Sequence, residues 1–319
     1  MLRGKKRHII ILALLPSFML MSLSGCFTGV EGTKAITQKD VNKALESDKK
    51  IIDDGGMSIY KIEYPIFSQW EKGKMFYVTD DNVKLLFNAS TLGNDTLSLK
   101  NKHLSYMGYS SDVAIDGKET VNIVLVDSLQ HKFMYPTNKT LYELDKTTGS
   151  YSIPYLIDMD NVLKLRSMLT GKELYVRTSI WYDDKGNMIK GRKFIKVAIE
   201  DVLPGNKYFP YRIKFKDLSD VAYLYVSSEQ SSVQNRLLSD LFSVTNPHDK
   251  YPTISDEKWA LIIKGDLILD MTKDECRLSL GAPKTIERMP TYDGLKEYWT
   301  YDNGTYLIFE DGLLRKYRK

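Results

Sequence analysis

The N-terminal segment constrains this chain most, because it determines the compartment in which the rest must fold. A basic cluster from Arg3 to Arg7 precedes an apolar run, Ile9 to Leu23, and small residues follow it. This order is typical of a secretory signal peptide, which we assign to residues 1–25. Pro16 and several serines interrupt the run, which is shorter than the ~20 apolar residues of a membrane span. We therefore expect a cleaved signal and not a transmembrane anchor.

The end of this segment predicts a lipid anchor. Leu23-Ser24-Gly25-Cys26 resembles the lipobox of bacterial lipoproteins, where the signal is cut before the cysteine. The resemblance implies that Cys26 is the lipidation site and that acyl chains such as palmitate attach the mature protein to a membrane. It is the one site residue that we predict. Phe27 follows it in place of an aspartate, which favours the outer membrane, and we expect the protein to face the periplasm.

Removal of the signal leaves a chain without net charge. Arg3, Lys5, Lys6 and Arg7 account for the formal charge of +4, and the other 41 basic residues balance the 41 acidic residues. Nucleic-acid binding calls for clustered Lys and Arg on one face, so we expect no nucleic-acid partner. Cys276 is the second of two cysteines. With Cys26 lipidated, no intramolecular disulfide is expected, and packing must hold the fold together.

The order of local signals divides the chain into six segments. Strand signals, which are β-branched and aromatic runs between Gly, Asn and Asp turns, dominate its middle. A helix capped by Asp160 and ending near Gly171 interrupts them, and Tyr182–Asn187 reads as a hairpin loop. The segments are 1–25, the signal; 26–57, a tether and a helix from Thr37; 58–150, a first β-rich module; 151–230, a second β-rich module; 231–253, a helix and linker; and 254–319, a C-terminal domain.

The two β-rich modules have matching strings. Gly73–Val78 matches Gly171–Val176, and a second match pairs Val124–Pro136 with Val197–Pro210. We interpret them as two small β modules of related plan and a possible duplication, with an insertion near Asn88–Ser111 in the first copy. The alternative is coincidence among short strand-like strings, because two copies are too few for a firm repeat.

The C-terminal segment has clear helix signals. Ser255 can cap a helix that ends at Gly265, and Thr272-Lys273-Asp274-Glu275 has the spacing of a capping box for a second helix, which ends at Gly281. Strand-like runs follow, separated by Asp302-Asn303-Gly304, which is a strong hairpin signal. The predicted order is helix, helix and antiparallel meander.

This segment resembles the SmpA/OmlA (BamE-like) family. The residues that carry the resemblance are Gly265, Met271–Glu275, Leu280–Pro283 and Trp299–Tyr301, with departures at Asp270 and Cys276. The resemblance implies two helices packed on a three-stranded sheet, and a protein of the cell envelope. The expected fold class is α+β: two small β-rich modules followed by a two-helix plus antiparallel meander BamE-like domain.

The sequence has no catalytic motif, and we expect a protein that is not an enzyme and that has no cofactor. His103, His131 and His248 fall on different predicted segments, so no metal site is expected. The acidic pairs Asp80-Asp81 and Asp183-Asp184 read as solvated turns, and Cys276 as a core residue. Of the 21 tyrosines, four fall near turns and could stack on sugar rings or form an interface: Tyr151, Tyr155, Tyr208 and Tyr211.

The favoured function is a non-enzymatic envelope lipoprotein that acts as a protein-interaction or assembly module at the outer membrane, with envelope proteins as partners. The first alternative is a lipoprotein that binds the cell wall (peptidoglycan) or another glycan. The second is a hydrolase with an unrecognised site, which would require two carboxylates, or a nucleophile and a base, in one cleft.

Overall fold

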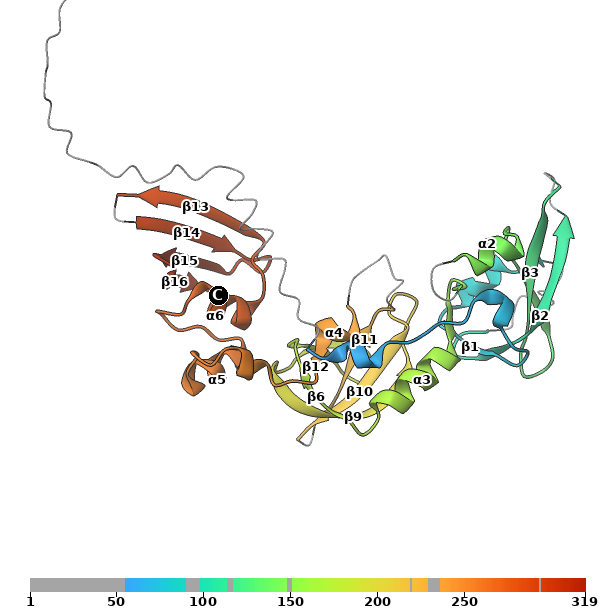
Figure 1. Cartoon of the computed structure of the whole chain (residues 1–319), viewed down its shortest axis with the longest axis horizontal. Coiled ribbons are helices and arrows are strands. Elements are labelled where there is room, and N and C mark those ends of the chain that lie inside the picture. The colour runs from blue at the N-terminus through green and yellow to red at the C-terminus, as the bar shows by residue number, and fades with distance from the viewer. Residues whose placement is uncertain are drawn as a thin grey trace, which may run out of the picture. The chain divides into compact units, whose positions relative to one another are not determined.

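The computed structural model describes residues 55–89, 98–113, 117–147, 151–218, 220–228, 236–292 and 294–319. Their strands form three antiparallel sheets of five, seven and four strands, and the helices among them are short (Figure 1). The expected α+β class is therefore wrong, because the described fold is mostly β. Strands occupy segments that showed only weak strand signals, such as 103–113. The helix predicted from Thr37 lies outside the described residues.

The first sheet has the strand order β4-β3-β2-β1-β5. Alternate residues of its strands, such as Phe76, Leu104 and Ile123, are buried on one face, as expected for a sheet with one covered side. Short helical segments carry Phe67 and Leu144 into the same core. The elements are β1 (Met75–Val78), β2 (His103–Val113), β3 (Glu119–Val126), β4 (Lys132–Pro136), β5 (Leu156–Asp158), η2 (Phe67–Gln69), η3 (Asp81–Leu86) and α2 (Leu141–Asp145).

The second sheet has the order β12-β6-β9-β10-β11-β7-β8. Its strands are β6 (Glu173–Val176), β7 (Ile180–Tyr182), β8 (Met188–Lys190), β9 (Ile195–Pro204), β10 (Tyr211–Asp217), β11 (Asp220–Val226) and β12 (Phe242–Ser243). The β7–β8 hairpin confirms the turn predicted at Tyr182–Asn187.

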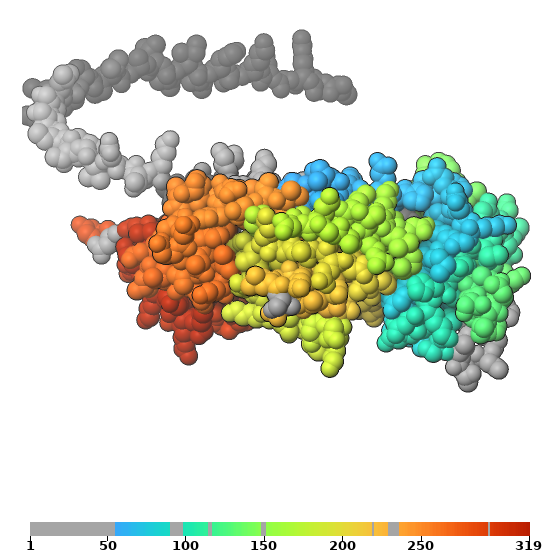
Figure 2. Space-filling model, turned by 90° about the horizontal axis from the view of Figure 1, so that it is seen from below, coloured from blue at the N-terminus to red at the C-terminus, as the bar shows by residue number. Residues whose placement is uncertain are grey.

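Helices cover one face of the second sheet. η1 (Met57–Tyr60), the chain that follows it, and α3 (Met159–Leu169) share a core with β10, in which Met57, Leu165 and Phe215 are buried. In Figure 2 the start of the described chain, in blue, lies against this part of the molecule. The N-cap of α3 is Asp158 and not the predicted Asp160, because Asp158 ends β5 in extended geometry and accepts the Asp160 N–H.

The first and second sheets follow one plan. The order β5-β1-β2-β3-β4 in the first corresponds to β12-β6-β9-β10-β11 in the second. Gly73 N–H donates to Tyr106 O at 2.7 Å, and Gly171 N–H donates to Ile199 O at 2.9 Å. A β-bulge follows Tyr106 in β2 and Ile199 in β9. Along the chain, a short helix comes directly before the equivalent edge strand of each sheet: α2 before β5, and α4 (Leu238–Leu241) before β12.

This plan corrects one of the two sequence matches. The match of Gly73–Val78 with Gly171–Val176 pairs β1 with β6, which occupy equivalent positions. The second match pairs β3 with β9 and is wrong, because β9 lies beside β6 as β2 lies beside β1. Alternating apolar strings are common to all half-buried strands, so they cannot distinguish one strand from another. The predicted insertion, near Asn88–Ser111, includes most of β2.

The C-terminal part forms α5 (Asp256–Lys264), α6 (Lys273–Leu280) and a four-stranded sheet of β13 (Thr285–Thr291), β14 (Gly294–Thr300), β15 (Tyr306–Glu310) and β16 (Leu313–Arg318). The caps at Ser255 and Thr272 and the end at Gly265 are confirmed. The expected BamE-like domain with its three-stranded sheet is corrected: β13, whose residues are mostly exposed and carry little strand signal, adds a fourth strand.

Cys276 is fully buried in the C-terminal core with Trp299 and Phe309, and burial raises the pKa of its thiol to about 12. This confirms the prediction of a core residue. The segment boundaries stay predictions. β5 lies after the boundary predicted between residues 150 and 151, yet it pairs with β1 of the first sheet. Within the described ranges, none of the helices is long and apolar enough to cross a membrane.

Candidate functional site

The single predicted site residue, Cys26, lies outside the described residues, and its lipidation stays a prediction. The three histidines of the mature chain lie apart. His131 Nδ1 is 2.8 Å from the Asp127 carboxylate in a turn, His248 stacks on Trp259 with ring centroids 4.4 Å apart, and His103 begins β2. In the part of the chain that the structure describes, no group of His, Cys, Asp or Glu could hold a metal ion.

Only one of the acidic pairs lies in a turn. Asp183-Asp184 lies in the β7–β8 hairpin turn, as predicted, whereas the turn prediction for Asp80-Asp81 is wrong, because Asp80 caps η3 and Asp81 is its first residue. Asp81 accepts the Lys100 and Leu99 N–H groups, and these hydrogen bonds, with that from Lys100 the strongest, lower the pKa of its carboxyl. The side chain of Asn187 does the same for Asp183. Both carboxylates thus have a structural role: Asp183 holds its own turn, and Asp81 ties η3 to the chain before β2.

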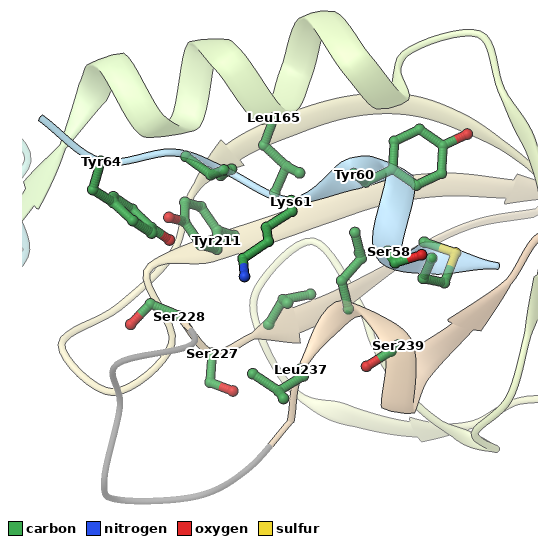
Figure 3. Close-up of a pocket in the computed structure, with 14 residues that line it drawn as sticks. Ser58, Tyr60, Lys61, Tyr64, Leu165, Tyr211, Ser227, Ser228, Leu237 and Ser239 are labelled. Carbon is green, nitrogen blue, oxygen red and sulfur yellow. The ribbon is translucent and has the colours of Figure 1, made fainter. Parts of the chain in front are cut away.

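A cavity of about 290 Å³ lies on the covered face of the second sheet (Figure 3). We call it the second-sheet hollow. Its walls come from η1 and the chain up to Tyr64, from α3, from the first residue of β10, from the end of β11 and from the start of α4. A volume of this size holds about ten water molecules and approaches the range of small-molecule pockets.

The walls of the second-sheet hollow are largely apolar. Ile62, Leu165 and Val226 are buried, and Leu237 and Leu238 lie partly exposed at its edge. The inward orientation of these residues follows from the burial pattern of their helix and strands. Leu165 lies on the buried stripe of α3, and Val226 is on the inner side of β11 opposite Tyr211 of β10. Of the four tyrosines singled out near turns, Tyr211 is the one in these walls.

The polar groups of the hollow are hydroxyls and one ammonium. The side chain of Lys61 projects into the space between Tyr211 and Leu237, with Ser227 and Ser239 nearby (Figure 3). Ser227 Oγ accepts the Arg236 N–H at 2.9 Å, which fixes its position. The described lining residues include no Asp or Glu, and Lys61 is the one charged residue among them.

The first sheet has a hollow at the corresponding place. This first-sheet hollow, of about 490 Å³, is lined in part by Val121 at the start of the inner strand β3 and by Thr140 and Tyr142 at the start of α2. In the first sheet, Thr137 N–H, just after β4, donates to Val121 O of β3. In the second sheet, Val226 of β11 pairs in the same way with Tyr211 of β10. Thr140 is the N-cap of α2, as Leu237 is of α4. The two hollows therefore share a place beside an inner strand and the start of a short helix, whereas η1 and α3 contribute only to the described lining of the second-sheet hollow.

The two hollows differ in charge. The first-sheet hollow is lined by both Lys118 and Glu119, whereas Lys61 is the one charged residue among the described lining residues of the second-sheet hollow. Sequence reasoning missed both hollows because their residues come from distant segments and form no motif. The equivalent placement of two short capped helices is a signal that becomes visible only with the strand order.

A smaller cavity of about 80 Å³ shares Tyr64, Tyr211 and Ser228 with the second-sheet hollow and reaches Asp158. Burial raises the pKa of Asp158, against the effect of Lys74, whose Nζ lies 2.7 Å from its carboxylate. Asn161 donates to the same carboxylate. Asp158 thus joins β1, β5 and α3, and it is the one acid among the described residues that line this cavity.

Comparisons of the chain with protein-family models, with curated proteins and with solved structures found no match. The lipobox and the C-terminal resemblance therefore rest on their own motif residues. The hollows rest on the geometry described above.

Proposed function

We propose that this protein is a lipid-anchored, non-enzymatic lipoprotein of the cell envelope that acts as an interaction or assembly module at the outer membrane, facing the periplasm. The observation that carries the proposal is the Leu23-Ser24-Gly25-Cys26 string at the end of a basic and then apolar segment. A protein exported in this way and held at Cys26 would present its sheets to other envelope components.

The described residues support a binding role. Each of the first two sheets has a hollow beside an inner strand and a short helix, and the second-sheet hollow has largely apolar walls with a few polar groups. This composition is typical of ligand and partner sites. Large apolar side chains are also exposed, among them Tyr142 and Met188, and such residues favour association where they are contiguous.

The anchor is tested by metabolic labelling with an alkyne analogue of palmitate, followed by fractionation of membranes. The Cys26→Ala variant is expected to lose both the label and membrane retention, because the thiol is the acceptor. Cys276→Ala is the matched control, since this thiol is buried, and it is expected to keep both. Label that persists in Cys26→Ala, or that is lost in Cys276→Ala, would contradict the proposal.

The interaction role is tested by crosslinking in intact cells and identification of the captured proteins. Envelope proteins of the outer membrane are expected to be enriched over those captured by the Cys26→Ala variant. Recovery of no envelope protein would count against the assembly role while leaving the anchor intact.

A second candidate, glycan or peptidoglycan binding, is favoured by one surface. On the outer face of the second sheet the Arg212 guanidinium lies 3.8 Å from the ring centroid of Tyr223, and Tyr182 meets Tyr225 edge to face at 4.9 Å. All three tyrosines are partly exposed, and such rings can stack on sugars. Sedimentation with purified peptidoglycan decides this candidate. Tyr223→Ala is expected to reduce binding severalfold, and Tyr292→Ala, on a distant exposed turn, is not.

A further inference from the structure

We infer that the second-sheet hollow binds a small amphiphile with a compact anionic head, a carboxylate or a phosphate, on a short apolar tail. The Lys61 ammonium would hold the head, and Leu165, Leu237 and Leu238 would contact the tail (Figure 3). This binding would be independent of the lipid anchor, because the described residues that line the hollow all lie after residue 56 of the chain.

The charge of the hollow calls for an anion. Lys61 is an exposed residue whose side chain reaches into the hollow (Figure 3). Two less exposed lysines have acidic partners: Lys74 pairs with Asp158 at 2.7 Å, and Lys273 pairs with Glu297 at 2.9 Å. No acidic group among the described residues pairs with Lys61, and none lines the hollow around it. A bound ligand that covers the exposed Lys61 ammonium would displace water from it, and the attraction would then strengthen because the local dielectric constant falls.

Hydroxyl groups add hydrogen-bond capacity beside Lys61. Ser227 Oγ accepts the Arg236 N–H, so its own O–H can donate to a ligand. Ser239, on the first turn of α4, places a second hydroxyl at the opposite edge. A carboxylate or phosphate accepts several such bonds, and hydrogen bonds to a charged group are stronger than those between neutral groups.

The apolar walls select a tail over a fully polar anion. Ile62 and Val226 close the floor, and about 290 Å³ leaves room for a head and a short chain but not for a long acyl chain. Each methylene that is buried against such walls stabilises the bound state. A bare inorganic anion would gain none of this.

The first-sheet hollow supplies an internal comparison. It also lies beside an inner strand and the start of a short helix, but Lys118 is accompanied there by Glu119. Its walls carry no unbalanced charge from these two side chains, so it is expected to have no preference for anions. Lys118→Met is thus a matched control for Lys61→Met.

The test is isothermal titration calorimetry on the whole mature chain, residues 26–319, carrying Cys26→Ala so that no lipid or detergent enters the assay. The probes are octanoate, octyl phosphate and the neutral octanamide, each below its micellar concentration. At least one anion is expected to bind about tenfold or more tightly than octanamide, as a charge-assisted hydrogen bond implies. Tighter binding of octanoate would point to a fatty acid as the source, and of octyl phosphate to a phospholipid headgroup.

Lys61→Met is expected to remove the preference for the anion while leaving the affinity for octanamide unchanged. Ser239→Phe, which fills the hollow, is expected to abolish binding of all three probes, with folding checked by circular dichroism. The inference is overturned if neither anion binds, if octanamide binds equally well, or if Lys118→Met weakens anion binding as much as Lys61→Met. Failure here would leave the labelling of Cys26 unaffected.

Discussion

The buried carboxylate of Glu297 shows how single residues set the stability of the C-terminal sheet. Lys273 Nζ lies 2.9 Å from one of its oxygens, and Trp299 Nε1 donates to the other at 3.2 Å. Arg288 Nε is 3.5 Å away. Burial raises the pKa of Glu297, but the hydrogen bonds and the two cations outweigh it and lower the pKa below its ordinary value. The carboxylate is therefore ionised and paired in the folded protein.

This arrangement predicts a pH-dependent effect of Glu297→Gln. Because the folded pKa is below the unfolded value, ionised Glu297 stabilises the fold at neutral pH, and the contribution is lost as pH falls through the folded pKa. We expect Glu297→Gln to reduce the free energy of unfolding by about 2 kcal/mol at pH 7, since it leaves two cations without their buried partner. The difference from wild type should shrink progressively below about pH 4.

Denaturant dependence of amide exchange in β14, measured at pH 7 and near pH 3, would check this. The control is Glu310→Gln, in an exposed pair with Lys296 at 2.9 Å, which is expected to cost less than about 0.5 kcal/mol. An effect of Glu297→Gln that is the same at both pH values would show that the ionised form contributes nothing specific.

At the scale of elements, the two short helices of the shared plan have the same start. Glu143 accepts the Thr140 N–H at 2.8 Å at the N-cap of α2, and Asp240 accepts the Leu237 N–H at 2.9 Å at the N-cap of α4. An acid at this position satisfies a backbone donor that has no partner within the helix. In both sheets the bond fixes a helix whose first residues line a hollow.

The Asp240→Ala variant is expected to loosen α4 by about 1 kcal/mol, the usual cost of a lost helix cap. Leu237 and Leu238 would then close the second-sheet hollow less well, and binding of the better anionic probe should weaken severalfold. Glu143→Ala is the matched change in the first sheet and should leave that binding unchanged. Calorimetry on both variants would check this. Equal losses of affinity in the two variants would show that binding of the anion does not depend specifically on the start of α4.

Elements governed by local chemistry were predictable from the sequence. Ser255, Thr272 and Gly265 set helix ends through bonds to residues a few positions away, and the turn after Tyr182 joins adjacent strands. The mostly exposed β13 was missed because its role depends on pairing with β14. Lys61 was missed for the same reason, since only the long-range packing of residues 57–64 on the second sheet brings it beside Tyr211.

At the scale of the whole molecule, each of the three sheets has its own hydrophobic core. Chains built in this way commonly unfold in more than one step. Cys276 provides a reporter for one of these cores, because it is fully buried and burial raises its thiol pKa to about 12. A thiol reagent can modify it only when the C-terminal core opens.

This predicts different effects of two large-to-small changes on the labelling of Cys276 in the mature chain carrying Cys26→Ala. Leu314→Ala, in the C-terminal core, should accelerate labelling by about thirtyfold or more. Such a change destabilises a core by about 2–5 kcal/mol, and the open state that the reagent modifies becomes more populated accordingly. Ile213→Ala, equally buried in the second sheet, should cost its own core a similar amount and leave the labelling rate nearly unchanged. Stopped-flow or manual assays with a chromogenic disulfide in mild urea would measure both rates. Equal acceleration by the two variants would show that the second and third cores open as one cooperative unit, so that a ligand bound in the second-sheet hollow would also protect Cys276.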